Sequence, residues 1–128
     1  SLGESLLGTG FPFRKYEYLE SYLETFRKLF LGCRGIRRAG AAVLDLAHLA
    51  AGRLDGFWEL YLKPWDMAAG ALMIEEAGGT VTDFFGGDGY LSSGNIVAGN
   101  PAIHGEILKV TKGSFTEEGV APLANGLI

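Results

Sequence analysis

The chain has 128 residues, of which 48% are hydrophobic and 20% charged, with a net charge of −4 at neutral pH. This length suffices for one domain with its own core, and the hydrophobic content excludes a disordered chain. The acidic balance argues against direct nucleic-acid binding, because such a face is normally basic. The single cysteine, Cys33, excludes a disulfide framework and fits a reducing compartment, so we expect a cytoplasmic protein.

No membrane or secretory segment is visible in the sequence. No apolar run approaches the roughly 20 residues that a membrane helix needs, and no signal peptide precedes the first expected strand. The chain begins at Ser1, without a methionine, and enters that strand almost at once. We therefore expect an excised piece of a longer protein; removal of a few leader residues is the other interpretation.

The expected elements alternate between strands and helices. Residues 5–9 are strand-like and lead into a Gly/Pro turn within the run SLLGTGFPF. Apolar residues recur at helical spacing over 16–30, and Gly32 is the expected stop. A short strand at 33–37 and an Ala/Leu-rich helix at 40–51 should follow, with Gly52 as the next stop.

The alternation continues to the end of the chain. We expect an aromatic strand at 55–62, a helix at 65–77 that Pro64 introduces, a β-branched strand at 80–84, a glycine-rich turn at 86–89, a short strand at 96–98 and a helix at 101–110. The fold class is therefore α/β, a layered αβα sandwich with a mixed sheet flanked by helices. We divide the chain into a domain at 1–112 and a tail at 113–128, whose end we expect to be partly disordered.

The segment PWDMAAGALMIEEAGG, residues 64–79, contains the first candidate for chemistry, Asp66. A carboxylate in the first turn of a helix can hold a metal ion while the helix N-terminus attracts a phosphate. Mg²⁺ prefers carboxylate oxygens, usually from one or two side chains together with substrate phosphate and water. The spacing leaves a second interpretation open, an ordinary first-turn acid stabilised by the helix dipole.

Two further candidates lie where strands meet helices. Glu59 lies on the strand before Asp66, and active groups gather at the carboxyl ends of strands in α/β folds. Glu59 could accept hydrogen bonds from a polyol, or simply face outward. Gly40, Ala41 and Ala42 open a helix, so their N–H groups could bind an oxyanion or a substrate hydroxyl. A packing contact between small residues is the alternative for this turn.

Other polar residues are ambiguous or have no assigned role. Arg37 and Arg38 could pair with phosphate, acidic side chains or a partner subunit, or could be exposed to solvent. His48 and His104 have no second ligand at zinc-like spacing. Cys33 has no CxxC partner, and we interpret it as a buried small residue.

Together these segments resemble the C-terminal half of the inositol monophosphatase family. PWDMAAGALMIEEAGG is similar to the C-terminal signature of that family, and GIRRAGAAVLDLAHLAAGRLDGFWELYLKPWD extends the match without a break. GTGFPF and SSGNIVAGNPAIHGEIL are also similar to bacterial members, so the resemblance covers roughly residues 5–110. It implies a Mg²⁺-dependent phosphomonoesterase with an αβαβα layered fold that hydrolyses inositol monophosphate.

The resemblance also implies roles for individual residues. Asp66 matches the signature aspartate, a metal ligand that also lies at the substrate, and Glu59 matches the acid that contacts inositol hydroxyls. Gly40, Ala41 and Ala42 match a substrate-contacting turn, although some members have a hydroxyl residue where Ala41 stands. The upstream glutamate and DPxDGT-like segment of the family, which supply most metal ligands and help position the attacking water, are absent from this sequence.

We therefore expect no catalytic residue in this chain, and little activity without an N-terminal half of the same enzyme as its partner. The similar signatures of fructose-1,6-bisphosphatase and nucleotide 3′-phosphatases leave those substrates open as alternatives. A bacterial relative is known as an extragenic suppressor protein linked to the transcription machinery, so the alternative of another class is a non-catalytic interaction module. We also expect a homodimer, with Arg37 and Arg38 near its interface, and exposed apolar surface where the absent half would pack.

Overall fold

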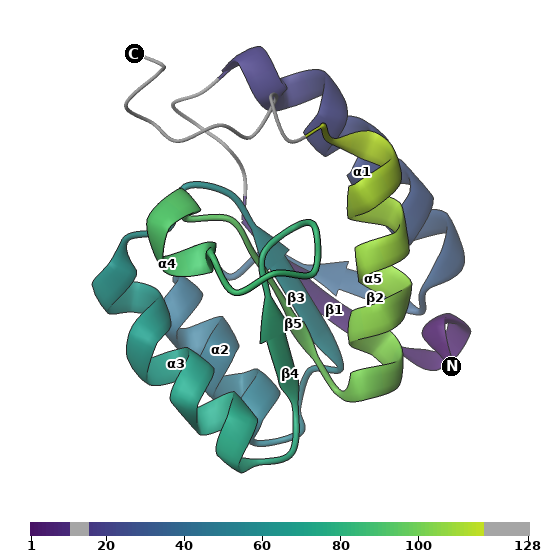
Figure 1. The fold of residues 1–128 in the computed structure, drawn as a ribbon. Coiled ribbons are helices and arrows are strands. Elements are labelled where there is room, and N and C mark those ends of the chain that lie inside the picture. The colour runs from purple at the N-terminus through teal and green to yellow at the C-terminus, as the bar shows by residue number, and fades with distance from the viewer. Residues whose placement is uncertain (11–15, 117–128) are drawn as a thin grey trace.

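The structure, a computed structural model, describes residues 1–10 and 16–116. Strands and helices alternate along the chain (Figure 1). The strands are β1 (Leu6–Thr9), β2 (Gly35–Arg37), β3 (Gly56–Glu59), β4 (Thr80–Thr82) and β5 (Ile96–Gly99). The α-helices are α1 (Leu19–Gly32), α2 (Ala42–Ala50), α3 (Pro64–Glu76), α4 (Tyr90–Ser93) and α5 (Pro101–Ser114), and short 3-10 helices lie at Leu2–Glu4 and Tyr16–Tyr18.

The described strands form one mixed sheet in the order β2-β1-β3-β5-β4. β1 pairs in parallel with β2 and with β3, whereas β5 runs antiparallel to both β3 and β4. The register places Gly8 opposite Phe57 and Trp58 opposite Val97. Because β1, β2 and β3 run in the same direction, their carboxyl ends meet at one edge of the sheet, which we call the carboxyl edge.

Helices cover both faces of the sheet and complete a three-layer sandwich (Figure 1). α2 and α3 lie side by side on one face, and α1 and α5 lie on the other. Successive strand residues point to opposite faces, so β3 contributes to two cores. Phe57 packs with Met67 beneath α2 and α3. Trp58 packs with Tyr22 and Ile107 beneath α1 and α5.

The expected αβα sandwich with a mixed sheet is confirmed, and the helix stops follow the predictions in part. Gly52, just after α2, has a φ of 81°, the left-handed conformation that glycine adopts most easily. Gly32 is different, because it is the last residue of α1 and has no positive φ. The chain becomes extended at Cys33, whose N–H donates to the carbonyl of Leu29 at 2.9 Å.

The C-terminal part of the chain departs further from the sequence predictions. A one-turn helix, α4, forms at Tyr90–Ser93, where none was predicted. α5 continues past 110 to Ser114, so the first residues of the tail assigned to 113–128 are helical. The rest of that tail from residue 117, and the Gly/Pro turn at Pro12, lie outside the described residues. No helix within the described ranges is both long and apolar enough to cross a bilayer.

The glycine-rich segment 86–89 is a turn, as predicted, and Asp83 holds it in place. The Oδ1 atom of Asp83 accepts hydrogen bonds from the N–H groups of Phe85 and Gly87, each at 2.9 Å. The N–H of Asp83 donates to the carbonyl of Gly87 at 2.9 Å, which closes the turn. These backbone groups therefore serve the turn itself and not a phosphate.

A glycine at their contact lets α2 and α3 pack closely. A β-carbon at Gly70 would lie 2.6 Å from Cδ1 and 2.8 Å from Cβ of Leu46, which is fully buried. Relief would require the helices to move apart, because the Cβ of a leucine cannot swing away. We predict that Gly70→Ala lowers the free energy of unfolding by about 1–3 kcal/mol through overpacking, measured by urea unfolding followed by circular dichroism.

Gly105 in α5 is the matched control, because a β-carbon there meets no described atom within 4 Å. Gly105→Ala should raise the free energy of unfolding by about 0.5–1 kcal/mol, since alanine loses less backbone entropy than glycine in a helix. Equal stability of the Gly70→Ala variant and the parent chain would contradict a tight contact between the two helices.

Candidate functional site

The carboxyl edge of the sheet brings the candidate residues together. Glu59 is the last residue of β3, and the turn at Gly40 follows β2. Ala42 begins α2 after that turn, and Asp66 lies in the first turn of α3. The candidates from three separate segments thus meet where α/β folds commonly bind ligands.

Glu59 lies against the end of β1. Strand alternation directs Glu59 to the same face as Phe57, the face that α2 and α3 cover. The carboxylate of Glu59 occupies the space beside Gly10, where a β-carbon would overlap both of its oxygens. Glu59 is half-buried, so it does not simply face outward into solvent.

Charged groups from three segments surround the Glu59 carboxylate. Desolvation is the main reason that the pKa of Glu59 rises to about 7. The negative charges of Asp45 and Asp66 raise this pKa further, and the positive charge of Arg38 opposes the rise. The Nη1 atom of Arg38 also lies 3.7 Å from the β-carbon position of Gly40. Arg38 is also exposed, so the structure is consistent both with solvent exposure and with an electrostatic interaction with an acidic side chain.

The turn from Gly40 to Ala42 presents backbone donors at the carboxyl edge. Gly40 has a φ of 85°, which explains why glycine stands there. Ala41 is the extended N-cap residue, and its carbonyl accepts from the N–H of Asp45 at 3.1 Å. No side chain in the described residues caps this helix end. The first N–H groups of α2 are therefore available to an anion or a hydroxyl.

Asp66 is half-buried at the positive end of the α3 dipole. Pro64 occupies the first helical position, where its missing N–H has no intrahelical role. The N–H of Asp66 donates to the carbonyl of Lys63 at 2.9 Å, which fixes the first turn. Residues 1–10 and 16–116 hold no group of three or more His, Cys, Asp or Glu side chains that could bind a metal ion. Asp66 can therefore offer Mg²⁺ one carboxylate, and the described residues do not complete the coordination.

Asp45 is the residue of this region that the sequence analysis misses. It lies in the first turn of α2 and is 2% exposed. Burial raises the pKa of Asp45, and the charges of Arg37 and His48 oppose the rise. The available signal was helical spacing, since Asp45 shares the inward face of α2 with the buried Leu49. A single acid on a face that is otherwise apolar indicates a specific role.

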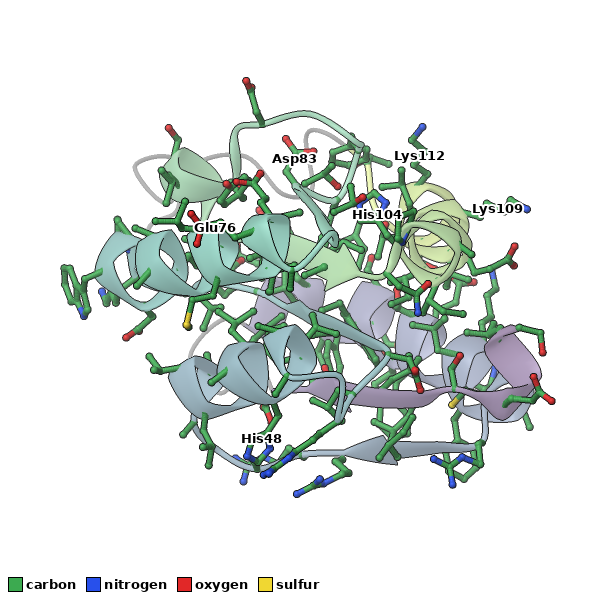
Figure 2. The ribbon with its side chains drawn as sticks, turned by 90° about the horizontal axis from the view of Figure 1, so that it is seen from below. His48, Glu76, Asp83, His104, Lys109 and Lys112 are labelled. Carbon is green, nitrogen blue, oxygen red and sulfur yellow. The ribbon has the colours of Figure 1, made fainter. Side chains whose placement is uncertain are left out.

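His104 and Cys33 make their contacts away from the carboxyl-edge site. His104 is buried and lies 2.8 Å from Oγ1 of Thr82, and desolvation lowers its pKa (Figure 2). Cys33 is half-buried, a correction to the buried position expected for it. The Sγ atom of Cys33 donates to the carbonyl of Gly35 at 3.4 Å. Burial raises the pKa of the thiol, which disfavours the thiolate that a nucleophile requires.

A pocket of about 190 Å³ lies at the opposite edge of the sheet, near the C-terminal ends of α2 and α3. Leu49, Ile74 and Asn100 are among the residues that line it. Its one acidic lining residue, Asp55, accepts a hydrogen bond from the N–H of Leu6 at 2.8 Å. Asp55 thus serves the fold, and the pocket contains none of the candidate site residues.

Glu59 should make the stability of the chain depend on pH. Its pKa rises from the ordinary 4.5 to about 7 on folding, so the folded state holds the proton more tightly. The stabilising effect of that proton is complete below pH 4.5 and is lost as the pH rises through about 7. We predict that Glu59→Gln raises the free energy of unfolding by about 1–3 kcal/mol in mildly alkaline buffer, and changes it little in acid.

Urea unfolding in mildly alkaline and in acidic buffer measures this difference. Glu76→Gln is the control, because Glu76 is exposed at the end of α3 (Figure 2). An equal effect of Glu59→Gln in both buffers would show that the Glu59 carboxylate is not desolvated.

A mixed sheet between two helical layers, with acids from β3 and from the first turn of α3 at its carboxyl edge, defines a domain of the αβαβα phosphatase fold. The profile of the inositol monophosphatase family matches residues 1–114. The chain belongs to the inositol monophosphatase family.

Individual relatives agree with this assignment. The Nus factor SuhB of Pseudomonas aeruginosa is 60% identical over 102 residues, a match that covers 78% of this chain and 38% of that protein. The crystal structure of the extragenic suppressor protein suhB from Bartonella henselae superposes with a TM-score of 0.83 and 46% identity, covering 87% of this chain and 42% of that chain. The inositol monophosphatase from Anabaena superposes with a TM-score of 0.77 and 37% identity. This match covers 97% of the present chain and 49% of the Anabaena chain. The chain thus spans less than half the length of these relatives.

Proposed function

We propose that the full-length protein to which this chain contributes is a Mg²⁺-dependent phosphomonoesterase that hydrolyses inositol monophosphate. The observation that carries the proposal is the meeting of Glu59, the turn at Gly40–Ala42 and Asp66 at one edge of the sheet. A half-buried acid beside free N–H groups suits a polyol, and a second acid at a helix N-terminus suits a cation next to a phosphate. Membership of the inositol monophosphatase family supports the reaction class.

Each group in the site has a separate role in this proposal. When bound, Mg²⁺ supplies Lewis-acid polarisation of the phosphate and a hydroxide nucleophile. Asp66 would give that ion one carboxylate oxygen. Glu59 would exchange hydrogen bonds with a hydroxyl of the alcohol, and the N–H groups at the start of α2 would orient the same part of the substrate. The other metal ligands would come from the remaining length of the protein.

The isolated 128-residue chain tests this division of roles. One carboxylate holds Mg²⁺ weakly, so the chain alone should hydrolyse inositol 1-phosphate at least about 10³-fold more slowly than the full-length protein. Phosphate release with and without Mg²⁺ measures both rates. Turnover by the chain alone at the full-length rate would show that the proposed ligands outside it are not required.

The substrate class includes two alternatives, fructose 1,6-bisphosphate and nucleotide 3′-phosphates. The carboxyl-edge site suits any alcohol with hydroxyls near the phosphate, so Glu59 and the turn at Gly40 do not choose between them. A substrate panel on the full-length protein tests the preference. We expect the highest kcat/KM with inositol 1-phosphate, and a higher value with either alternative would reassign the substrate.

A contact with the transcription machinery is the second candidate function, because the Pseudomonas aeruginosa relative is a Nus factor. Arg37 ends the edge strand β2, and both Arg37 and Arg38 are exposed. Such a surface could bind an acidic partner. Pull-down with RNA polymerase tests this, and capture of an Asp66→Asn variant without phosphatase activity would show two separable roles. Failure of the unmodified full-length protein to bind would remove this candidate.

We also propose that the full-length protein is a cytoplasmic homodimer and that further parts of it cover apolar surface of this chain. Large apolar side chains are exposed on the outer helices: Leu23, Phe30 and Leu31 on α1, Val43 and Leu44 on α2, and Trp65, Leu72 and Met73 on α3. Exposed apolar surface of this kind favours association. The isolated chain should therefore associate as its concentration rises, and light scattering that reports a monomer throughout would contradict this.

A further inference from the structure

Two glycines of β1 make room for two acidic side chains. Gly8 and Gly10 lie two residues apart, so they share the sheet face that α2 and α3 cover. The carboxylate of Glu59 fills the position that a side chain at Gly10 would need. A β-carbon at Gly8 would lie 3.6 Å from Cγ of Asp45. The two carboxyl groups, from α2 and β3, therefore lie above neighbouring positions of the same strand.

Asp45 lies within the fold, beside the strand position of Gly8. It is 2% exposed, and no hydrogen bond or ion pair links its side chain to another residue within 1–10 and 16–116. Neither carboxyl oxygen of Asp45 is among the atoms that are both shielded from solvent and unpartnered, so a water molecule can supply a hydrogen bond there. Among the charges near Glu59, the charge of Asp45 has the largest effect on the pKa of Glu59. Asp45 exposes the smaller fraction of its residue surface, whereas Glu59 ends β3 at the carboxyl edge, where a ligand would approach.

We propose that Asp45 is a positioning residue, which holds the Glu59 carboxyl group in the orientation that receives the alcohol part of the substrate. This inference rests on the function proposed above. Two carboxyl groups whose charges act on each other resist simultaneous ionisation, so the pair retains one proton near neutral pH. That proton, shared through one ordered water, gives Asp45 a polar partner and restrains Glu59.

The surroundings favour a restrained pair. Around Glu59, the charge of Asp66 favours retention of the proton and the charge of Arg38 opposes it. The phenol of Tyr22, from α1, also lies within electrostatic reach of Glu59. Around Asp45, the charges of Arg37 and His48 favour ionisation, so Asp45 is the better acceptor of the shared proton.

Enzyme kinetics on the full-length protein tests the proposal. Asp45→Leu removes the partner, so Glu59 should lose its orientation toward substrate hydroxyls. The ratio of kcat/KM for inositol 1-phosphate to kcat/KM for phenyl phosphate, whose alcohol has no further hydroxyl, should fall about tenfold. Asp45→Asn keeps the shape and one hydrogen bond and should recover part of this ratio. Glu106→Gln, on the surface of α5, is the control for loss of an acid.

A double-mutant cycle shows whether Asp45 acts through Glu59. In a Glu59→Gln background, Asp45→Leu should have no further effect on the substrate ratio. Equal losses on both substrates, or the same loss with and without Glu59, would reduce Asp45 to a structural role and overturn the inference.

A titration separates failure of this inference from failure of the proposed function. In the isolated chain, Asp45→Asn should lower the pKa of the Glu59 carboxyl, followed by carbon-13 NMR and assigned with Glu59→Gln. This measurement needs no catalysis. An inactive full-length protein would therefore contradict the phosphatase proposal, whereas the titration would still test the pairing of Asp45 with Glu59. An unchanged Glu59 titration would overturn the pairing.

Discussion

Asp66→Asn in the full-length protein is expected to lower the Mg²⁺-dependent hydrolysis of inositol 1-phosphate by about 10²- to 10³-fold. An amide keeps the shape of the side chain but removes the negative charge that attracts the cation. The Mg²⁺ concentration for half-maximal activity should rise together with the fall in kcat. Steady-state phosphate release over a range of Mg²⁺ concentrations measures both changes.

The fold should survive this substitution, because an acid in the first helical turn contributes only about 0.3–1 kcal/mol through the helix dipole. Glu76→Gln, at the other end of the same helix, is the matched control and should leave the Mg²⁺ dependence unchanged. An Asp66→Asn protein with the parent's Mg²⁺ dependence would show that Asp66 is an ordinary first-turn acid.

Trp58→Ala is expected to lower the free energy of unfolding of the isolated chain by about 3–5 kcal/mol. Trp58 is the largest of the fully buried side chains, and its ring lies 6.2 Å from that of Tyr22 and 6.4 Å from that of Phe26. Its removal leaves a cavity between β3 and α1 that these neighbours cannot fill. Thermal unfolding followed by circular dichroism measures the loss.

Trp65 provides the comparison because the chain has two tryptophans in opposite environments. Trp65 is 72% exposed in the first turn of α3. Trp65→Ala should change the free energy of unfolding by no more than about 0.5 kcal/mol, as surface substitutions usually do. Similar losses for the two variants would contradict the packing described for the core beneath α1 and α5.

The sequence predicts a helix boundary correctly where a single residue at that boundary determines it. Pro64 at the first helical position and Gly52 after α2 correctly predict one helix start and one helix stop. The last turn of α5 has no comparable signal, because Gly113 weakens the helical pattern there. Tertiary contacts hold that turn, since Oγ1 of Thr111 donates to the carbonyl of Phe84 at 2.9 Å. The rings of Phe84 and Phe115 also pack at 4.8 Å.

The candidate site, too, could be predicted only in part from the sequence. Asp66, Glu59 and the turn at Gly40 follow from their places at the ends of strands and helices, and from the family resemblance. The environment of Glu59 could not be predicted in this way, because it depends on how β1 and α2 are positioned next to β3. Gly10 and Asp45 come from distant parts of the sequence, and no local pattern in either segment indicates their proximity to Glu59. The proposed pairing of Asp45 with Glu59 could therefore be inferred only from the assembled sheet.

The contrast between the two tryptophans gives the chain a built-in optical probe. The buried indole of Trp58 should emit at shorter wavelength and resist collisional quenchers, whereas Trp65 should emit at longer wavelength and be quenched readily. Trp65 directly precedes Asp66, so a cation or phosphate ester at that carboxylate should alter only the long-wavelength emission of Trp65. Ligand occupancy could then be followed in the isolated chain without a label.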